Sequence, residues 1–244
     1  MARAARPDYG LDAPGLVRAF LLGGASAVVV GMALILWAGA GLLAILGNLL
    51  LWPGLIFFIE GLLMIMSSRY GKMRARDRLL DGLHLRGDEH VLDVGCGRGL
   101  LLIGAAKRLP RGEATGLDPW SQADLSDNSQ AATLANAQIE GVAGRVKVQS
   151  GDMRAMPFPD SSFDAAVASL SIHNIYNREG RREAINEIVR VLRPGGSVAL
   201  QDMQHVGKYA EDLRAAGMEN AQTSGLSFWI FPPVRVVTGR KPAR

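Results

Sequence analysis

A glycine-rich stretch at residues 91–99 is the part of this chain best suited to binding a ligand. It reads VLDVGCGRG, an apolar strand-like run followed by glycines at alternate positions. Glycines let the backbone turn sharply and approach a ligand closely, and the helix that follows offers free N–H groups at its N-terminus. The next strand-like run ends in Asp118, which is placed to accept hydrogen bonds from the two hydroxyls of a ribose. Together these features predict a cofactor that contains a nucleoside.

The residues around the glycines favour one cofactor over another. A dinucleotide-binding loop would need a further glycine at position 100, where this chain has leucine. Asp93 stands two residues before Gly95, and its carboxylate would repel a pyrophosphate but attract a cationic amino-acid tail. S-adenosylmethionine has such a tail and a sulfonium, so we predict S-adenosylmethionine. A membrane-bound nicotinamide oxidoreductase stays open as the less favoured alternative.

One histidine could serve as a general base. His173 follows the strand-like run at residues 163–169, and the carboxyl ends of parallel strands face the ligand crevice. A neutral imidazole there could take a proton from an acceptor, or it could merely hold the loop in place. Asp202 and His205 follow the next strand at the same edge. No cluster of His and Cys has metal-ligand spacing, so we predict no metal.

Apolar runs that alternate with helical stretches predict an α/β fold with a doubly wound, mostly parallel sheet. A lead-in helix over 73–85 comes first, and the tail over 219–241 predicts a closing antiparallel pair. The expected strands cover 91–94, 114–118, 146–149, 163–169 and 198–201, and the expected helices cover 100–109, 129–140 and 178–192.

An apolar block precedes this domain. Residues 19–68 contain 36 apolar side chains out of 50, and Glu60 is the only charge among them. A helix of 50 residues would be about 75 Å long, more than twice the thickness of a membrane core. We therefore predict a hairpin of two transmembrane helices, over 19–38 and 49–66. The block is too long to be a cleaved signal peptide. The domain boundaries follow: residues 1–72 form the anchor and residues 73–244 the soluble domain.

The flanking charges predict the orientation and the packing of this hairpin. Arginines precede the first pass, a basic cluster over 69–78 follows the second, and the turn is uncharged; both ends should therefore be cytoplasmic. The cluster suits an anionic membrane surface, so we predict a lipid bilayer and no nucleic acid as partner. Gly23, Ala27 and Gly31 predict a face for close helix packing. The single cysteine, Cys96, is consistent with a reducing compartment.

A polar stretch over 121–128 separates Asp118 from its expected helix. It could form a lid over the ligand, or an extended helix start capped by Ser121 or Asn128. Trp120, just before it, could stack on the adenine or belong to the core.

Four motifs in order give residues 73–244 a resemblance to the class I S-adenosylmethionine-dependent methyltransferases. They are residues 91–99; GLD at 116–118; GDM at 151–153, before the PF at 157–158; and LRPGG at 192–196. The resemblance implies a Rossmann-like, seven-stranded sheet. Within the family, the domain most resembles the members that act on small molecules and lipids, because the sequence lacks the Asn-Pro-Pro-Tyr tetrad of the nucleic-acid enzymes. The membrane helices are an addition to the family's common core.

The resemblance also implies site residues. Asp93 and the glycines Gly95, Gly97 and Gly99 would hold the methionine portion of the cofactor, and Asp118 would hold the ribose. Asp152 and Met153 would lie along the adenine, and the segment 168–173, with Ser169, would line the pocket near the sulfonium.

We therefore predict methyl transfer to a small, lipophilic acceptor at the cytoplasmic membrane face. The reaction is an in-line displacement, for which the protein supplies proximity and a dry site. Little chain is left after the fifth strand to cover a substrate beyond 206–217, so the membrane helices are the remaining candidates for that cover. The alternative is a non-catalytic module that binds S-adenosylmethionine and whose helices recruit a membrane partner.

Overall fold

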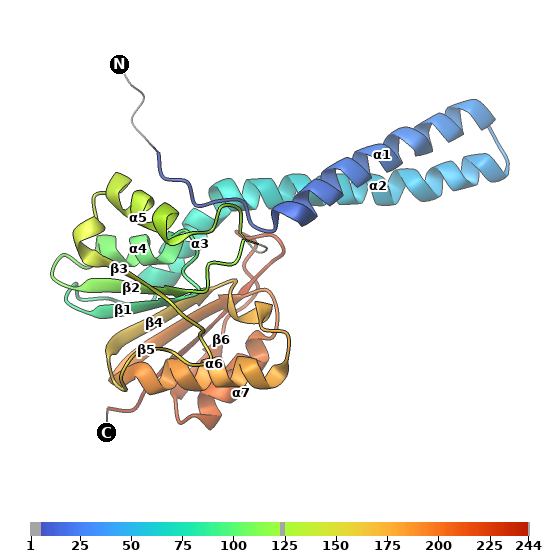
Figure 1. The fold of residues 1–244 in the computed structure, drawn as a ribbon. Helices are drawn as coiled ribbons and strands as arrows, with labels where there is room; N and C mark the ends of the chain where they lie inside the picture. Colours follow the sequence, from blue (N-terminus) through green and yellow to red (C-terminus); the bar gives the residue numbers. More distant parts are fainter. Residues whose placement is uncertain (1–5, 123–124, 244) are drawn as a thin grey trace, which may run out of the picture.

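An antiparallel helical hairpin projects from a compact α/β unit in the computed structural model, which describes residues 6–122 and 125–243 (Figure 1). Helix α1 covers Pro14–Ala38 and α2 covers Leu42–Met66. Both helices are long and apolar enough to cross a membrane by length and composition. The second helix begins seven residues earlier than the expected residue 49. Gly39 and Gly41, with φ of 65° and 89°, complete the turn by themselves.

Glycines bring the two helices into backbone contact. Gly24 and Gly31 of α1 face Gly54 and Gly47 of α2, and the spacing on each helix is seven residues. A Cβ at Gly31 would lie 2.6 Å from the carbonyl oxygen of Gly47, so only glycine permits this approach. Two residues of the expected face lie at this contact, because Gly31 meets Gly47 and a Cβ built at Gly54 would lie 2.8 Å from the Cβ of Ala27. Gly23 does not, because a Cβ there would meet open space, and Gly24 takes its place.

No linker separates the hairpin from the α/β unit. Helix α2 continues through a π-helical turn, Ser67–Gly71 (η1), into α3, Lys72–Asp81. The segment 6–13, which precedes α1, runs back over the α/β unit (Figure 1). We call this segment the strap. The hairpin and the α/β unit are thus joined both by a continuous helix and by the strap.

The α/β unit contains the expected seven-stranded sheet, with strand order β3-β2-β1-β4-β5-β7-β6 among the described residues. Strands β1 to β5 are parallel and β7 is antiparallel to both of its neighbours. The strands are β1 (His90–Val94), β2 (Glu113–Asp118), β3 (Val146–Ser150), β4 (Phe163–Ser169), β5 (Leu192–Asp202), β6 (Glu219–Thr223) and β7 (Arg235–Arg240).

Helices cover both faces of the sheet (Figure 1). One apolar core joins α3 and α4 to one face, and a second joins α6 and α7 to the other. The helices are α4 (Leu100–Arg108), α5 (Gln130–Ile139), α6 (Arg178–Val191) and α7 (Val206–Ala215), with short 3₁₀ turns η2 (Ala143–Arg145) and η3 (Ile172–Asn174). The strand order reverses between β1 and β4, and the carboxyl ends of strands at such a point form a crevice that binds ligands.

Candidate functional site

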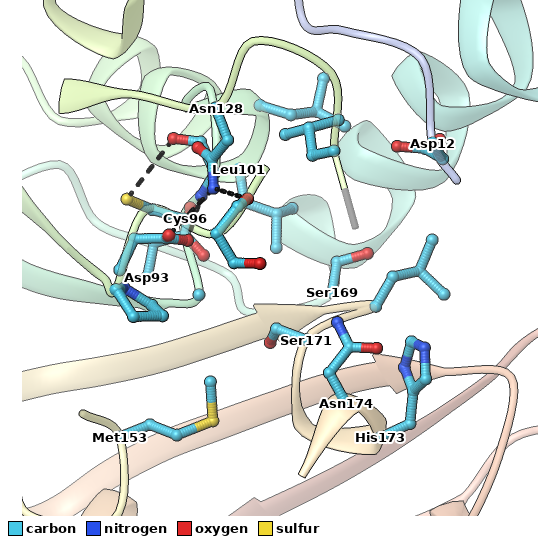
Figure 2. A pocket seen from close by; sticks show the side chains of 18 of the residues that line it. Asp12, Asp93, Cys96, Leu101, Asn128, Met153, Ser169, Ser171, His173 and Asn174 are labelled. Atoms are coloured by element: carbon cyan, nitrogen blue, oxygen red, sulfur yellow. Dashed lines mark hydrogen bonds between the residues drawn. The ribbon is translucent and has the colours of Figure 1, made fainter. Parts of the chain in front are cut away.

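A pocket of about 610 Å³ opens at the carboxyl ends of β1 and β4 (Figure 2). Most of the residues predicted from the sequence line it: Asp93, Gly95, Gly97, Asp118, Asp152, Met153, Ser169 and His173. Gly99 and Trp120 are not among the lining residues, so their contact with a cofactor stays a prediction.

The glycine loop forms the floor of this pocket. Gly95, Gly97 and Gly99 have φ of 74°, 51° and 86°, a conformation that other residues rarely adopt. A Cβ at Gly95 would lie 2.3 Å from the Cβ of Ser171. Gly99 instead is the residue before α4 and packs on Thr133. Its positive φ is therefore explained by the turn of the backbone into α4.

Asp118 ties the second strand to the glycine loop. Its Oδ2 accepts a hydrogen bond from the N–H of Gly97 (2.8 Å), and its Oδ1 accepts from the N–H of Trp120 (2.7 Å). The side-chain amide of Asn128 donates to the same Oδ1 at 3.0 Å. Each carboxylate oxygen can accept more than one bond, so the buried carboxylate retains capacity toward a diol in the pocket.

Asn128 is a site residue that the sequence reasoning missed. Its amide nitrogen is used twice, by Asp118 and by the carbonyl of Ser121. Its Oδ1 is buried without a hydrogen-bond partner in the described structure, and the residue lines the pocket. A buried, unpartnered acceptor of this kind fits a ligand hydroxyl or amine. The N-cap of α5 is Ser129, and not Ser121 or Asn128 as expected from the sequence.

Asp93 is the second buried carboxylate of the pocket. Its Oδ2 accepts a hydrogen bond from the N–H of Leu102 (2.8 Å), in the first turn of α4. Burial, together with repulsion from Asp118, raises the pKa of Asp93 to about 8 despite this bond. A cation placed beside Asp93 would reverse that effect, which fits an ammonium group and not a phosphate.

The opposite rim of the pocket carries Asp152 and Met153. Asp152 forms an ion pair with Arg154, and the hydrogen bonds from that guanidinium hold the pKa of Asp152 below its usual value. Met153 is buried and forms the adjoining wall. Trp120 is turned toward β3, where its indole N–H donates to the hydroxyl of Ser150 at 2.7 Å.

His173 and Asp202 meet where β4 and β5 end. Nδ1 of His173 lies 2.7 Å from Oδ1 of Asp202, with the imidazole 14% and the carboxylate 2% exposed. The contact is close but is not aligned as a hydrogen bond. Asp202 also accepts from the N–H groups of His173 and Met203 and from the hydroxyl of Tyr209. The carboxylate is thus fixed, and it faces one ring nitrogen. His205 precedes α7 and is not among the lining residues.

The strap closes one side of the pocket and was also missed. Tyr9, Asp12 and Ala13 line the pocket beside Lys72 of α3. Arg98 of the glycine loop forms an ion pair with Asp8 at 3.0 Å. The polar stretch over 121–128 joins this cover in its described part, because Ser126 exchanges hydrogen bonds with Leu11. The lid interpretation of that stretch is therefore favoured.

Chemically, the pocket combines buried carboxylates, a histidine and apolar walls. Among the described residues, no group of three or more His, Cys, Asp or Glu side chains could hold a metal ion. Leu170, Met203 and Ile230 give the end near His173 an apolar lining. The donors and acceptors fit a nucleoside with a cationic tail, and the apolar end fits a second, lipophilic molecule.

Comparison with known proteins identifies the family of this fold. Residues 91–196 match the family described as "Methyltransferase domain". The ubiquinone/menaquinone biosynthesis C-methyltransferase UbiE of Dinoroseobacter shibae is 29% identical over 191 residues, which cover 74% of this chain and 70% of that protein. The sterol 4-C-methyltransferase strm-1 of Caenorhabditis elegans is 31% identical, over 55% of this chain but only 37% of its own length.

Solved structures agree on the fold. An S-adenosylmethionine-dependent methyltransferase from Aquifex aeolicus superposes with a TM-score of 0.54 at 17% identity, covering 68% of this chain and 88% of that one. The sequence matches, the sheet order and the glycine loop therefore agree with one another, and the predicted cofactor class is confirmed. Residues 91–196 thus match a methyltransferase domain, and the α/β unit that contains them has the fold of S-adenosylmethionine-dependent methyltransferases.

Proposed function

We propose that the protein transfers the methyl group of S-adenosylmethionine to a small, lipophilic acceptor at the cytoplasmic face of a membrane. The observation that carries this proposal is the pocket itself. It joins the glycine loop to His173 and to an apolar end bounded by Leu170, Met203 and Ile230. The names of the relatives, a quinone and a sterol methyltransferase, support a lipophilic acceptor.

Asp118 and Asn128 would hold the ribose, and Asp93 with Gly95 and Gly97 would hold the methionine portion. Asp152 and Met153 would border the adenine, while Ser169 would lie near the sulfonium. When bound, S-adenosylmethionine supplies an activated methyl group with a good leaving group. His173 would accept the proton of an acceptor O–H or acidic C–H through Nε2, while Asp202 stabilises the resulting imidazolium. The buried walls would exclude water from the transfer.

The carboxylate of Asp118 can be tested by direct cofactor binding. Asp118→Ala should weaken S-adenosylhomocysteine binding by about 1.5–3 kcal/mol, because charge-assisted hydrogen bonds to the ribose are lost. Calorimetry on the purified protein measures this change, with Asp88→Ala, an exposed carboxylate remote from the pocket, as the matched control. NADH should not bind. Unchanged affinity in the Asp118 variant, or binding of NADH, would contradict the assignment.

The raised pKa of Asp93 predicts a pH dependence of binding. Asp93 is largely neutral below about pH 8, whereas the ammonium of the cofactor binds to the ionised form. Affinity for S-adenosylhomocysteine should therefore rise as the pH increases from about 6 to 8, by up to about tenfold per unit. Titrations across this window should show proton release at the lower pH values. Asp93→Asn should flatten the profile; a flat profile in the unaltered protein would refute the role of Asp93.

Turnover tests the proposed function and the histidine together. With a labelled methyl donor and a reduced lipid extract from the source cell, the protein should transfer label into an extractable lipophilic product. His173→Asn should keep cofactor affinity and lower turnover by roughly 10²–10⁴-fold if the acceptor arrives protonated, since a base is removed. The loss should shrink at higher pH if the acceptor ionises by itself. Cofactor binding without labelled product in any fraction would favour the non-catalytic module.

Asp202 provides the matched test of a positioning role. Asp202→Asn can still accept one backbone N–H, but its amide would point a donor at Nδ1 of His173 and favour the wrong tautomer. Turnover should fall and its pH profile should change, while cofactor affinity stays. Tyr209→Phe removes another hydrogen bond to the same carboxylate and should have a small effect. Equal losses in the two variants would mean that Asp202 only supports the loop.

The proposed topology places both ends of the hairpin in the cytoplasm and the turn after α1 on the far side. Its support is the basic residues that flank an uncharged turn. An Ala40→Cys variant in intact cells should react with an impermeant thiol reagent, whereas Ala143→Cys, exposed on the α/β unit, should be protected. The reverse pattern of labelling, or extraction of the protein by high salt, would overturn the hairpin topology.

A further inference from the structure

We propose that the loop over 224–234, between β6 and β7, lies in the headgroup region of the cytoplasmic leaflet and forms the entrance for the methyl acceptor. We call it the aromatic loop. This inference rests on the proposed membrane anchor, and it adds a second, peripheral contact with the lipid surface.

The aromatic loop lies at the level where the hairpin leaves its apolar span. The N–H of Phe231 donates to the hydroxyl of Ser67 at 2.9 Å, directly after the last residue of α2. The backbone of Trp229 approaches Gly71 so closely that a Cβ there would lie 1.7 Å from the carbonyl oxygen. The loop is thus seated against η1, at the foot of the hairpin (Figure 1).

The tip of the loop is held rigidly. Ser227 and Val234 exchange backbone hydrogen bonds of 2.7 and 3.0 Å across it. Ile230 and Val234 are buried against Ala75 of α3, next to Leu170 and Met203. A fixed loop cannot withdraw its outward side chains from the solvent by folding them inward.

Those outward side chains are apolar. Phe228 is 76% and Leu226 is 52% exposed, although Ile230 and Val234 of the same loop are buried. Large apolar groups exposed beside a membrane span are typical of segments that enter the lipid interface. Their continuity with the hairpin identifies the lipid surface, rather than a protein, as the partner that covers them.

Cationic side chains surround the same patch. The guanidinium groups of Arg74 and Arg78 lie 4.8 and 5.4 Å from the ring centroid of Trp229. These two arginines and Arg69 form no ion pair with a carboxylate of the described residues. Arginine and tryptophan together suit the boundary between anionic headgroups and acyl chains.

The position of Ile230 connects this surface to the reaction. Ile230 lines the pocket, two residues after Phe228. The aromatic loop is therefore at once a wall of the acceptor end and a contact with the lipid. An acceptor with a hydrocarbon tail could keep its tail in the leaflet while its head group reaches His173.

The test uses the full chain in vesicles of phosphatidylcholine and phosphatidylglycerol. A polarity-sensitive dye is attached to Phe228→Cys, and quenching by headgroup-labelled nitroxide lipid is measured. The native Cys96 is buried, and burial raises the pKa of its thiol, so it should not compete for the dye. Quenching at residue 228 should exceed that at the control, Ala143→Cys, by about twofold or more. Unchanged binding of S-adenosylhomocysteine verifies that each variant is folded, and Leu226→Cys serves as a second site.

A dye at Val29→Cys, which is 67% exposed on α1, separates the two proposals. Quenching at residue 29 by acyl-chain nitroxide, with residues 226 and 228 no more quenched than 143, would overturn the aromatic-loop proposal and leave the anchor intact. Absence of quenching at residue 29 as well would overturn the membrane anchor and the loop proposal with it.

Discussion

The buried ammonium of Lys72 joins the hairpin, the strap and the pocket. Lys72 is 5% exposed and begins α3, and its Nζ donates to the carbonyls of Tyr9 and Gly10 at 2.9 and 2.7 Å. An ion pair with Asp12 at 3.4 Å completes the shell. Burial lowers the pKa of Lys72 and Asp12 partly opposes this. Removing an ammonium from water costs several kcal/mol, so the strap must stay in place to compensate it. The side wall of the pocket therefore depends on this one cation.

Charge is divided across the pocket in a way that selects its ligand. Asp93 and Asp118 are both buried at the floor, and their mutual repulsion contributes to the raised pKa of Asp93. The cations Lys72 and Arg98 are already paired with the strap. The floor thus offers the ligand the carboxylate of Asp118, and that of Asp93 once a bound cation favours its ionised form; these carboxylates would repel a pyrophosphate. The charge at the floor and the leucine at position 100, where a dinucleotide-binding loop has glycine, both disfavour a dinucleotide.

The sequence could predict the sheet and the glycine loop because their signals are local. Strand runs, the three glycines and Asp118 each follow from short patterns, and these elements lie where expected. The contacts that were missed join distant residues: Asp8 to Asn136, Tyr9 to Lys72, and His173 to Asp202. No periodicity marks such pairs. On the hairpin, Ala27 and Gly31 of the predicted face meet α2, whereas Gly24 and not Gly23 makes the third contact, since the position of the partner helix decides which small residue it meets.

The π-helical turn explains how one helix can serve two environments. Helix α2 is apolar around most of its surface, whereas α3 buries Leu79 and Leu80 in the core with α4 and the sheet, and Ala75 against the aromatic loop. A π-turn inserts an extra residue and so shifts the helical phase by about 100°. The shift at η1 directs Lys72 toward the strap, and Gly71 admits the backbone of Trp229. Because no flexible linker follows, the carboxyl edge of the sheet is held at a fixed height above the hairpin. Ile230, a wall of the pocket, is therefore kept beside the foot of that hairpin, because its neighbours Trp229 and Phe231 contact Gly71 and Ser67 of η1.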